Sequence, residues 1–100
     1  MAYTIFATIK YDSREDRLKV LPCFMAHRER CLADEPGTLQ FDISLSNDDD
    51  TTIMVYEVYD NEAAFQAHAQ GESMQKLRVE LEALGVNPSM RTVVHGTLAE

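Results

Sequence analysis

Apolar and polar residues alternate in four stretches of the chain, and this period of two is typical of β-strands. The alternation predicts strands at Tyr3–Lys10, Thr38–Leu45, Thr52–Tyr59 and about residues 90–98. The first and third stretches carry apolar side chains on both faces. We therefore expect the sheet to be covered on both sides.

The segment after the first strand has the apolar spacing of a helix. Ser13 is placed to cap it, acidic residues follow in the first turn, and the pattern continues to about Asp34. Pro22 lacks a backbone donor, so it is expected to bend or break the helix. The predicted core-facing stripe consists of Leu18, Leu21, Met25 and Leu32, with Phe24 beside it.

Two more helices are expected between the third and fourth strands. The first covers about residues 61–69, and the second is capped by Ser73 and ends at Gly85. The apolar stripe of the second comprises Met74, Leu77, Leu81 and Leu84. The order β-α-β-β-α-β predicts a single α+β domain over residues 1–100 with the ferredoxin-like arrangement. Because its helices cover one sheet face, a second copy of the chain is expected on the other, forming a homodimer.

Charge and composition narrow the choice of partners. The formal net charge is −8 and no basic cluster is present, which argues against nucleic acid binding. No stretch approaches the roughly 20 apolar residues that a membrane span needs. Without a secretory signal pattern, residence in the cytoplasm is expected. Cys23 and Cys31 are too few for a disulfide framework and are expected to be free thiols.

The chain contains none of the short motifs that bind nucleotides or zinc, or that build a serine hydrolase. Its histidines are scattered at positions 27, 68 and 95. His27 lies off the predicted apolar stripe and is expected at the surface, while a structural role is expected for His95. His68 shares a helical face with Phe65, on the side that packs against the sheet. An imidazole there is either a hydrogen-bonded core residue or a group that transfers protons.

The end of the third strand also carries polar groups. Tyr56 and Tyr59 fall on opposite faces, so only one of them can point toward the helices. Glu57 shares its face with Tyr59. A carboxylate on an apolar strand is costly unless it is paired or solvated. Glu57 is therefore either a catalytic base or the partner of a cation, with Arg28, Arg30 and Arg91 available.

Three segments together resemble the antibiotic biosynthesis monooxygenase domain family, which includes quinol monooxygenases and an autoinducer-phosphate isomerase. They are Glu35–Asp42, Tyr56–Tyr59 and Ala64–His68, and their order and spacing agree with that family. The resemblance extends over nearly the whole chain. It implies a dimeric α+β barrel made of two ferredoxin-like protomers joined through their sheets.

The resemblance also implies an activity. Members often oxidise small polycyclic or quinol-type aromatics with O₂, without a metal, flavin or haem cofactor. In this chain His68 would handle the proton, aided by Tyr56 or Glu57. The pocket for the aromatic substrate would be lined by Phe41, Tyr59 and Phe65.

Two departures from the family pattern limit this expectation. Ser73 stands where many relatives carry a second histidine ahead of a methionine. The chain has no tryptophan and its first strand has no asparagine, which argues against the haem-degrading branch. Two alternatives stay open. One is an isomerase of a small, possibly phosphorylated hydroxyketone, with Arg28, Arg91 and Lys76 as phosphate ligands. The other is a non-catalytic dimeric module that only binds a ligand.

Overall fold

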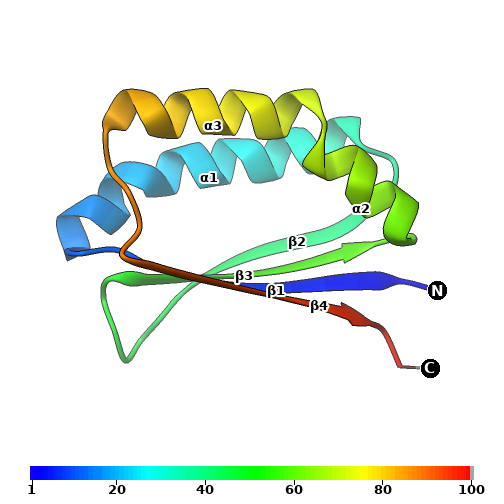
Figure 1. Ribbon diagram of the computed structural model, residues 1–100, viewed down its shortest axis with the longest axis horizontal. Coiled ribbons are helices and arrows are strands. Elements are labelled where there is room, and N and C mark those ends of the chain that lie inside the picture. The colour runs from blue at the N-terminus through cyan, green and yellow to red at the C-terminus, as the bar shows by residue number, and fades with distance from the viewer. Residues whose placement is uncertain (100) are drawn as a thin grey trace.

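A four-stranded antiparallel sheet with three helices on one face makes up the protein (Figure 1). The computed structural model describes residues 1–99. The order of the strands across the sheet is β2-β3-β1-β4. This is the predicted ferredoxin-like α+β fold, with one additional short helix. The elements are β1 (Tyr3–Lys10), α1 (Arg14–Asp34), β2 (Thr38–Leu45), β3 (Thr52–Tyr59), α2 (Glu62–Ala69), α3 (Glu72–Leu84) and β4 (Met90–Thr97).

The core lies between the sheet and the helices. In β1 every second side chain is directed there, and the neighbouring strands supply residues in register, as in the pairs Ile9–Ile53 and Ala7–Val55. Phe41 on β2 is opposite Glu57 on β3, so this carboxylate enters the apolar layer. The alternation that predicted the strands therefore recurs in the burial of β1 and β3, whereas among the apolar residues of β2 only Phe41 is buried and Leu39 and Leu45 are exposed.

The predicted apolar stripe of α1 was wrong. Leu18, Met25 and Leu32 are 51%, 41% and 36% exposed. The buried side chains of α1 are instead Arg17, Val20, Phe24, His27 and Cys31. Their spacing of three and four residues also defines one helical face. The side chains on that face pack against the sheet, although Arg17 and His27 among them are polar.

Pro22 does not break α1, which continues through it to Asp34. The backbone carbonyl that would pair with the missing N–H belongs to Leu18. Because Leu18 is on the exposed side of the helix, water can bond to this carbonyl. The predicted interruption was therefore wrong.

Helix α2 begins with a side-chain cap, whereas α3 begins at a glycine. Asn61 caps α2 by accepting a hydrogen bond from the Ala64 N–H at 2.9 Å. The N-cap of α3 is Gly71 and not the predicted Ser73, whose hydroxyl bonds to side chains of α1. Gly85, in the left-handed region at φ 67°, ends α3 as predicted.

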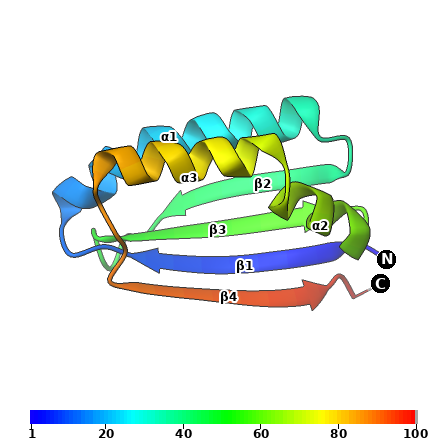
Figure 2. The ribbon, with the colours of Figure 1, turned by 45° about the horizontal axis from the view of Figure 1, so that its top comes forward.

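The second face of the sheet has no cover within the protomer. Figure 2 shows all three helices on one side and β4 at the sheet edge away from α1. Phe6 and Val94 on the open face are 53% and 61% exposed. None of the helices within residues 1–99 has both the length and the apolar character needed to cross a bilayer.

Candidate active site

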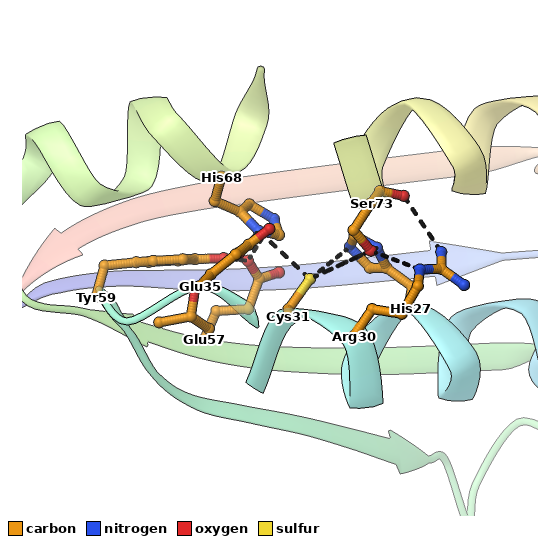
Figure 3. A network of polar contacts seen from close by, with 9 residues as sticks. His27, Arg30, Cys31, Glu35, Glu57, Tyr59, His68 and Ser73 are labelled. Atoms are coloured by element: carbon orange, nitrogen blue, oxygen red, sulfur yellow. Dashed lines mark hydrogen bonds and ion pairs between the residues drawn. The ribbon is translucent and has the colours of Figure 1, made fainter. Parts of the chain in front are cut away.

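His68 is held between two carboxylates at the end of α2 (Figure 3). Its side chain is 2% exposed. Nδ1 lies 2.8 Å from Glu35 Oε1, and Nε2 lies 3.8 Å from Glu57 Oε1. Because a carboxylate accepts hydrogen bonds, Nδ1–H donates to Glu35, and in this tautomer Nε2 is the nitrogen that can accept a proton. Nε2 faces Glu57 across a gap too long for a direct hydrogen bond.

Glu35 occupies a fixed position because the chain turns there from α1 into β2. It is the C-cap of α1, and its backbone N–H donates to the Cys31 carbonyl at 3.1 Å. Thr38 Oγ1 donates to the same Glu35 oxygen that receives His68, at 2.8 Å. Two donors therefore orient this carboxylate, which in turn orients the imidazole of His68.

Glu57 is a buried carboxylate with an altered acidity. Burial raises its pKa above the ordinary value, against the opposing effects of the Tyr59 hydrogen bond and of His68. The Tyr59 hydroxyl donates to Glu57 Oε1. Burial and the neighbouring Glu57 charge also raise the pKa of Tyr59 far above its usual range, so this hydroxyl remains a donor. No arginine forms an ion pair with Glu57 among the described residues, so the predicted pairing with Arg28, Arg30 or Arg91 was wrong.

Both His68 and Glu57 line a cavity of about 440 Å³ between the sheet and the helices. Its walls are largely apolar and include Phe41, Phe65 and Leu77. This volume is within the range of small-molecule sites, which combine apolar walls with a few convergent polar groups. A second cavity of about 650 Å³ adjoins His68 on its other side and is lined by charged groups that include Arg30 and Lys76.

A thiol and a second histidine complete the polar cluster. His27 is 1% exposed, and its Nδ1 lies 2.9 Å from Ser73 Oγ. Arg30 Nε donates to the same hydroxyl at 2.9 Å. Burial, with a smaller effect of His68, lowers the pKa of His27 to about 4, so the ring is neutral near pH 7. Cys31 is fully buried beside His27 and His68, and burial raises the pKa of its thiol to about 12.

Most of the predicted site residues meet in this place. The ring of His68 has its centroid 5.1 Å from that of Tyr59, 6.1 Å from Phe41 and 6.4 Å from Phe65. Tyr56 is not brought to the cluster. It lies on the open face of the sheet, with its ring centroid 4.7 Å from that of Phe6. His95 does not line the cavity. At the exposed end of β4 it bonds to the Tyr3 hydroxyl at 2.6 Å, and its ring packs edge-on against Phe65 with a centroid distance of 5.3 Å.

Sequence reasoning missed three members of the cluster. The expectation of a surface position for His27 was wrong, and neither Cys31 nor Glu35 was considered for the site. These residues stand at intervals of four along α1 and its C-cap, which places them on one helical face. That interval was visible in the sequence. It was overlooked because the leucines and methionine of α1 gave an apparently better apolar stripe.

Comparison with known proteins supports a family for this chain. Residues 4–79 match the model of the antibiotic biosynthesis monooxygenase family. No curated protein shows a significant match.

Solved structures show a close likeness in fold. A candidate antibiotic biosynthesis monooxygenase from Caulobacter crescentus CB15 superposes with a TM-score of 0.89 at 16% identity, over 99% of this chain and 91% of that one. A similar candidate from Nitrosomonas europaea has a TM-score of 0.81 at 21% identity, over 95% and 88%. A third candidate, from Deinococcus radiodurans, superposes with a TM-score of 0.81 at 17% identity, over 100% of this chain and 94% of that one. At these identities the likeness establishes the fold, and the matched family model establishes the family. The chain belongs to the antibiotic biosynthesis monooxygenase family.

Proposed function

We propose that the protein is a cofactor-independent monooxygenase that oxidises a small aromatic or quinol-type substrate with O₂. The observation that carries the proposal is the meeting of His68 Nε2 and the Glu57 carboxylate at one apolar cavity. Family membership supports monooxygenase activity in general, and the cavity favours a substrate with an aromatic body and a hydroxyl group.

In the proposed reaction His68 is the base. Nε2 accepts a proton from the bound substrate, while Glu35 holds Nδ1–H and balances the charge of the imidazolium that forms. Glu57, oriented by Tyr59, accepts a hydrogen bond from a second hydroxyl of the substrate. His68 thus acts through Nε2 and Glu57 through its carboxylate, because both residues line the cavity.

Oxygen then reacts with the electron-rich anion. The substrate carbanion or phenolate supplies electrons to O₂, a carbon–oxygen bond forms, and the imidazolium returns its proton to the peroxide. The oxygen–oxygen bond breaks as a ring C–H proton is lost, leaving a carbonyl on the product and releasing water. For a quinol the balance is one quinol plus one O₂ giving one hydroxyquinone plus one water, so the substrate is the only reductant required.

The apolar walls have a defined part in this chemistry. Phe41, Phe65 and Leu77 exclude water, which strengthens the electrostatic contact between His68 and the anion and protects the intermediate.

We extend the proposal to a homodimer formed through the open face of the sheet. Strands β1, β3 and β4 expose Phe6, Met54 and Val94 there, and no described residue of the protomer covers them. Residence in the cytoplasm stays a prediction from the sequence.

The experiment measures oxygen consumption by chelator-treated protein with a panel of quinols and anthrone-like phenols. We expect uptake above the rate of autoxidation. Replacing His68 by Gln should lower the turnover by about 10²–10⁴-fold, the usual contribution of a positioned general base. The matched control is His95→Gln, which alters an exposed histidine that does not line the cavity but packs against Phe65, so turnover should fall much less than in His68→Gln.

The outcomes separate the alternatives. Equal loss in His68→Gln and His95→Gln, or full activity in both, would contradict the proposed role of His68. Absence of uptake across the panel would remove the monooxygenase proposal. Isomerisation of a hydroxyketone without oxygen uptake would then favour the isomerase, and ligand binding without turnover the non-catalytic module. A mass of one chain by light scattering at micromolar concentration would refute the dimer.

A further inference from the structure

Three buried side chains bring metal-ligating atoms together next to the proposed active site. They are His27, Cys31 and His68, and one ligating atom from each lies within 4.8 Å of the other two. Their exposed fractions are 1%, 0% and 2%. Figure 3 shows the Cys31 sulfur between the two imidazoles. Such a cluster has little stabilising effect on its own, because a thiol is a weak hydrogen-bonding group.

The distances fit a tetrahedral ion. Cys31 Sγ lies 3.6 Å from His27 Nε2 and 3.6 Å from His68 Nδ1. With zinc–sulfur and zinc–nitrogen bonds of ~2.3 and ~2.05 Å, the sulfur–nitrogen edge of a tetrahedron is also about 3.6 Å. Imidazole and thiolate are the ligands that zinc prefers in proteins. The two sulfur–nitrogen distances therefore match the edges of a tetrahedral site, whereas Glu35 Oε1, now hydrogen-bonded to His68 Nδ1 at 2.8 Å, must move back to make room for the ion.

The fold fixes the three ligands through two elements. His27 and Cys31 are one turn apart on the buried face of α1. His68 comes from α2, which is pressed against the end of β2, since a Cβ on Gly37 would lie only 2.6 Å from that of Ala64. The ligand positions thus follow from the packing of α2 against the sheet and of α1 beneath it.

The surroundings supply the outer contacts of a metal site. If His27 ligates through Nε2, its Nδ1–H donates to Ser73 Oγ, which is already 2.9 Å away. If His68 ligates through Nδ1, its Nε2–H is turned toward Glu57. Glu35 Oε1, at 2.8 Å from Nδ1, is close enough to become the fourth ligand.

Charge in the neighbourhood also favours a cation. Arg30 opposes it, but its guanidinium is engaged by the Ser73 hydroxyl and by Glu80 at 3.5 Å. When the ion binds, the Cys31 thiol must lose its proton, and its thiolate together with the two carboxylates that flank His68 then supplies negative charge on the other sides. The sequence predicted no metal site, because His68 is far along the chain from the pair on α1.

We propose that His27, Cys31 and His68 bind a zinc ion, with the Glu35 carboxylate as the fourth ligand. The site shares His68 and Glu35 with the proposed oxygen chemistry, which concerns the metal-free protein and is assayed after chelator treatment. Failure to bind zinc would leave that activity as it is, and failure to consume oxygen would leave the zinc site as it is.

The test uses Co²⁺ as a coloured probe for the zinc position. Chelator-treated protein is titrated with Co²⁺ and followed by absorption. We expect one ion per chain, visible bands of the intensity typical of four-coordinate cobalt, and a near-ultraviolet band from thiolate-to-cobalt charge transfer. Added Zn²⁺ should bleach all of these bands.

A matched pair of variants identifies the thiol. Cys31→Ser should abolish the charge-transfer band and weaken Zn²⁺ binding by about 100-fold or more. Cys23→Ser changes the other thiol of the same helix, outside the cluster, and should leave both unchanged. His27→Gln should weaken Zn²⁺ binding to a similar degree and remove the tetrahedral spectrum.

Several results would overturn the proposal. One is a folded wild-type protein without the charge-transfer band. Another is a band that persists in Cys31→Ser or disappears in Cys23→Ser. If Cys31→Ser does not fold, X-ray absorption of the wild-type protein with Zn²⁺ decides the matter. One sulfur at about 2.3 Å with two imidazoles would support the site, and an all-oxygen shell would refute it.

Discussion

The hydrogen bond from Tyr59 to Glu57 should control both the acidity of Glu57 and the stability of the fold. Tyr59 is fully buried, and its hydroxyl donates to Glu57 Oε1. The variant Tyr59→Phe removes that hydroxyl and keeps the ring. Glu57 then loses a donor that favours its charged form, so the pKa of Glu57 rises further above its ordinary value.

The size of the effect depends on pH. A hydrogen bond to a charged group contributes about 1.5–3 kcal/mol to stability and one between neutral groups about 0.5–1.5 kcal/mol. The difference is roughly 1.4 kcal/mol, which corresponds to about one pKa unit. At low pH, where the carboxyl is protonated, the variant should lose ~1 kcal/mol, and above the folded-state pKa of Glu57, where the carboxyl is charged, ~2–3 kcal/mol.

The sign follows from linkage. The folded-state pKa of Glu57 is already above its unfolded value, so its contribution to stability is present at low pH and is lost as pH rises through the folded value. Tyr59→Phe moves the folded value upward. The loss of stability caused by the substitution must therefore grow with pH.

Urea denaturation from pH 4 to pH 8, followed by far-ultraviolet circular dichroism on chelator-treated protein, measures the loss. The control is Tyr11→Phe, because Tyr11 is also buried at the cavity and burial raises its pKa to about 12, so it stays protonated throughout. We expect the effect of Tyr11→Phe to be independent of pH. An equally pH-independent effect of Tyr59→Phe would refute the bond to an ionisable Glu57.

Three further predictions concern packing and protonation. Gly37→Ala should destabilise the protein by about 1–3 kcal/mol in urea denaturation, because the new Cβ would meet the Ala64 Cβ at 2.6 Å. Adding Ala64→Gly should restore part of the loss, and the reasoning fails if Gly37→Ala alone is neutral. Val20→Ala should cost about 1–3 kcal/mol because Val20 is fully buried. Leu18→Ala, on the exposed side of the same helix, should stay within about 0.5 kcal/mol, and the reverse order would show that α1 is rotated. His27, with its pKa lowered to about 4, must charge as the chain unfolds in acid, so stability should fall by ~2 kcal/mol as pH drops from about 6.5 toward 4. His27→Gln should flatten that part of the stability profile, and an unchanged slope would contradict the neutral buried ring.

Some residues of the candidate site could be predicted from the sequence, and others could not. Periodicity placed His68 on the side of its helix that packs against the sheet and placed Glu57 and Tyr59 on one face of β3, without deciding whether that face meets the helices. The structure turns Glu57 and Tyr59 toward the helices and brings them together with His68 and Phe41. The same periodicity placed Tyr56 on the other face, although the resemblance to the family had named it as a helper. A period of two decides the face of a strand residue because the pleat allows no intermediate orientation.

The partners of His68 could not be read from the sequence in the same way. Glu35 and Cys31 are 33 and 37 residues from it along the chain, and they meet it only because α2 packs against the end of α1. No local sequence pattern predicts a contact between residues so far apart along the chain. The rotation of α1 about its own axis was the decisive unknown, since two faces of this helix carry apolar residues.

The sequence by itself determined the order of the elements and most of their approximate bounds, since these depend on contacts between near neighbours: alternation in strands, Gly85 at the end of α3, and turns. The start of α3 was an exception, because its N-cap is Gly71 and not Ser73. Only the tertiary structure decided which face of α1 is buried, and with it the position of His27. That choice depends on the summed packing of the whole helix against the sheet, where shape outweighs the hydrophobicity of single residues such as Leu18 and Met25. A buried histidine beside a thiol is the result, and it could be recognised only after the helix was in place.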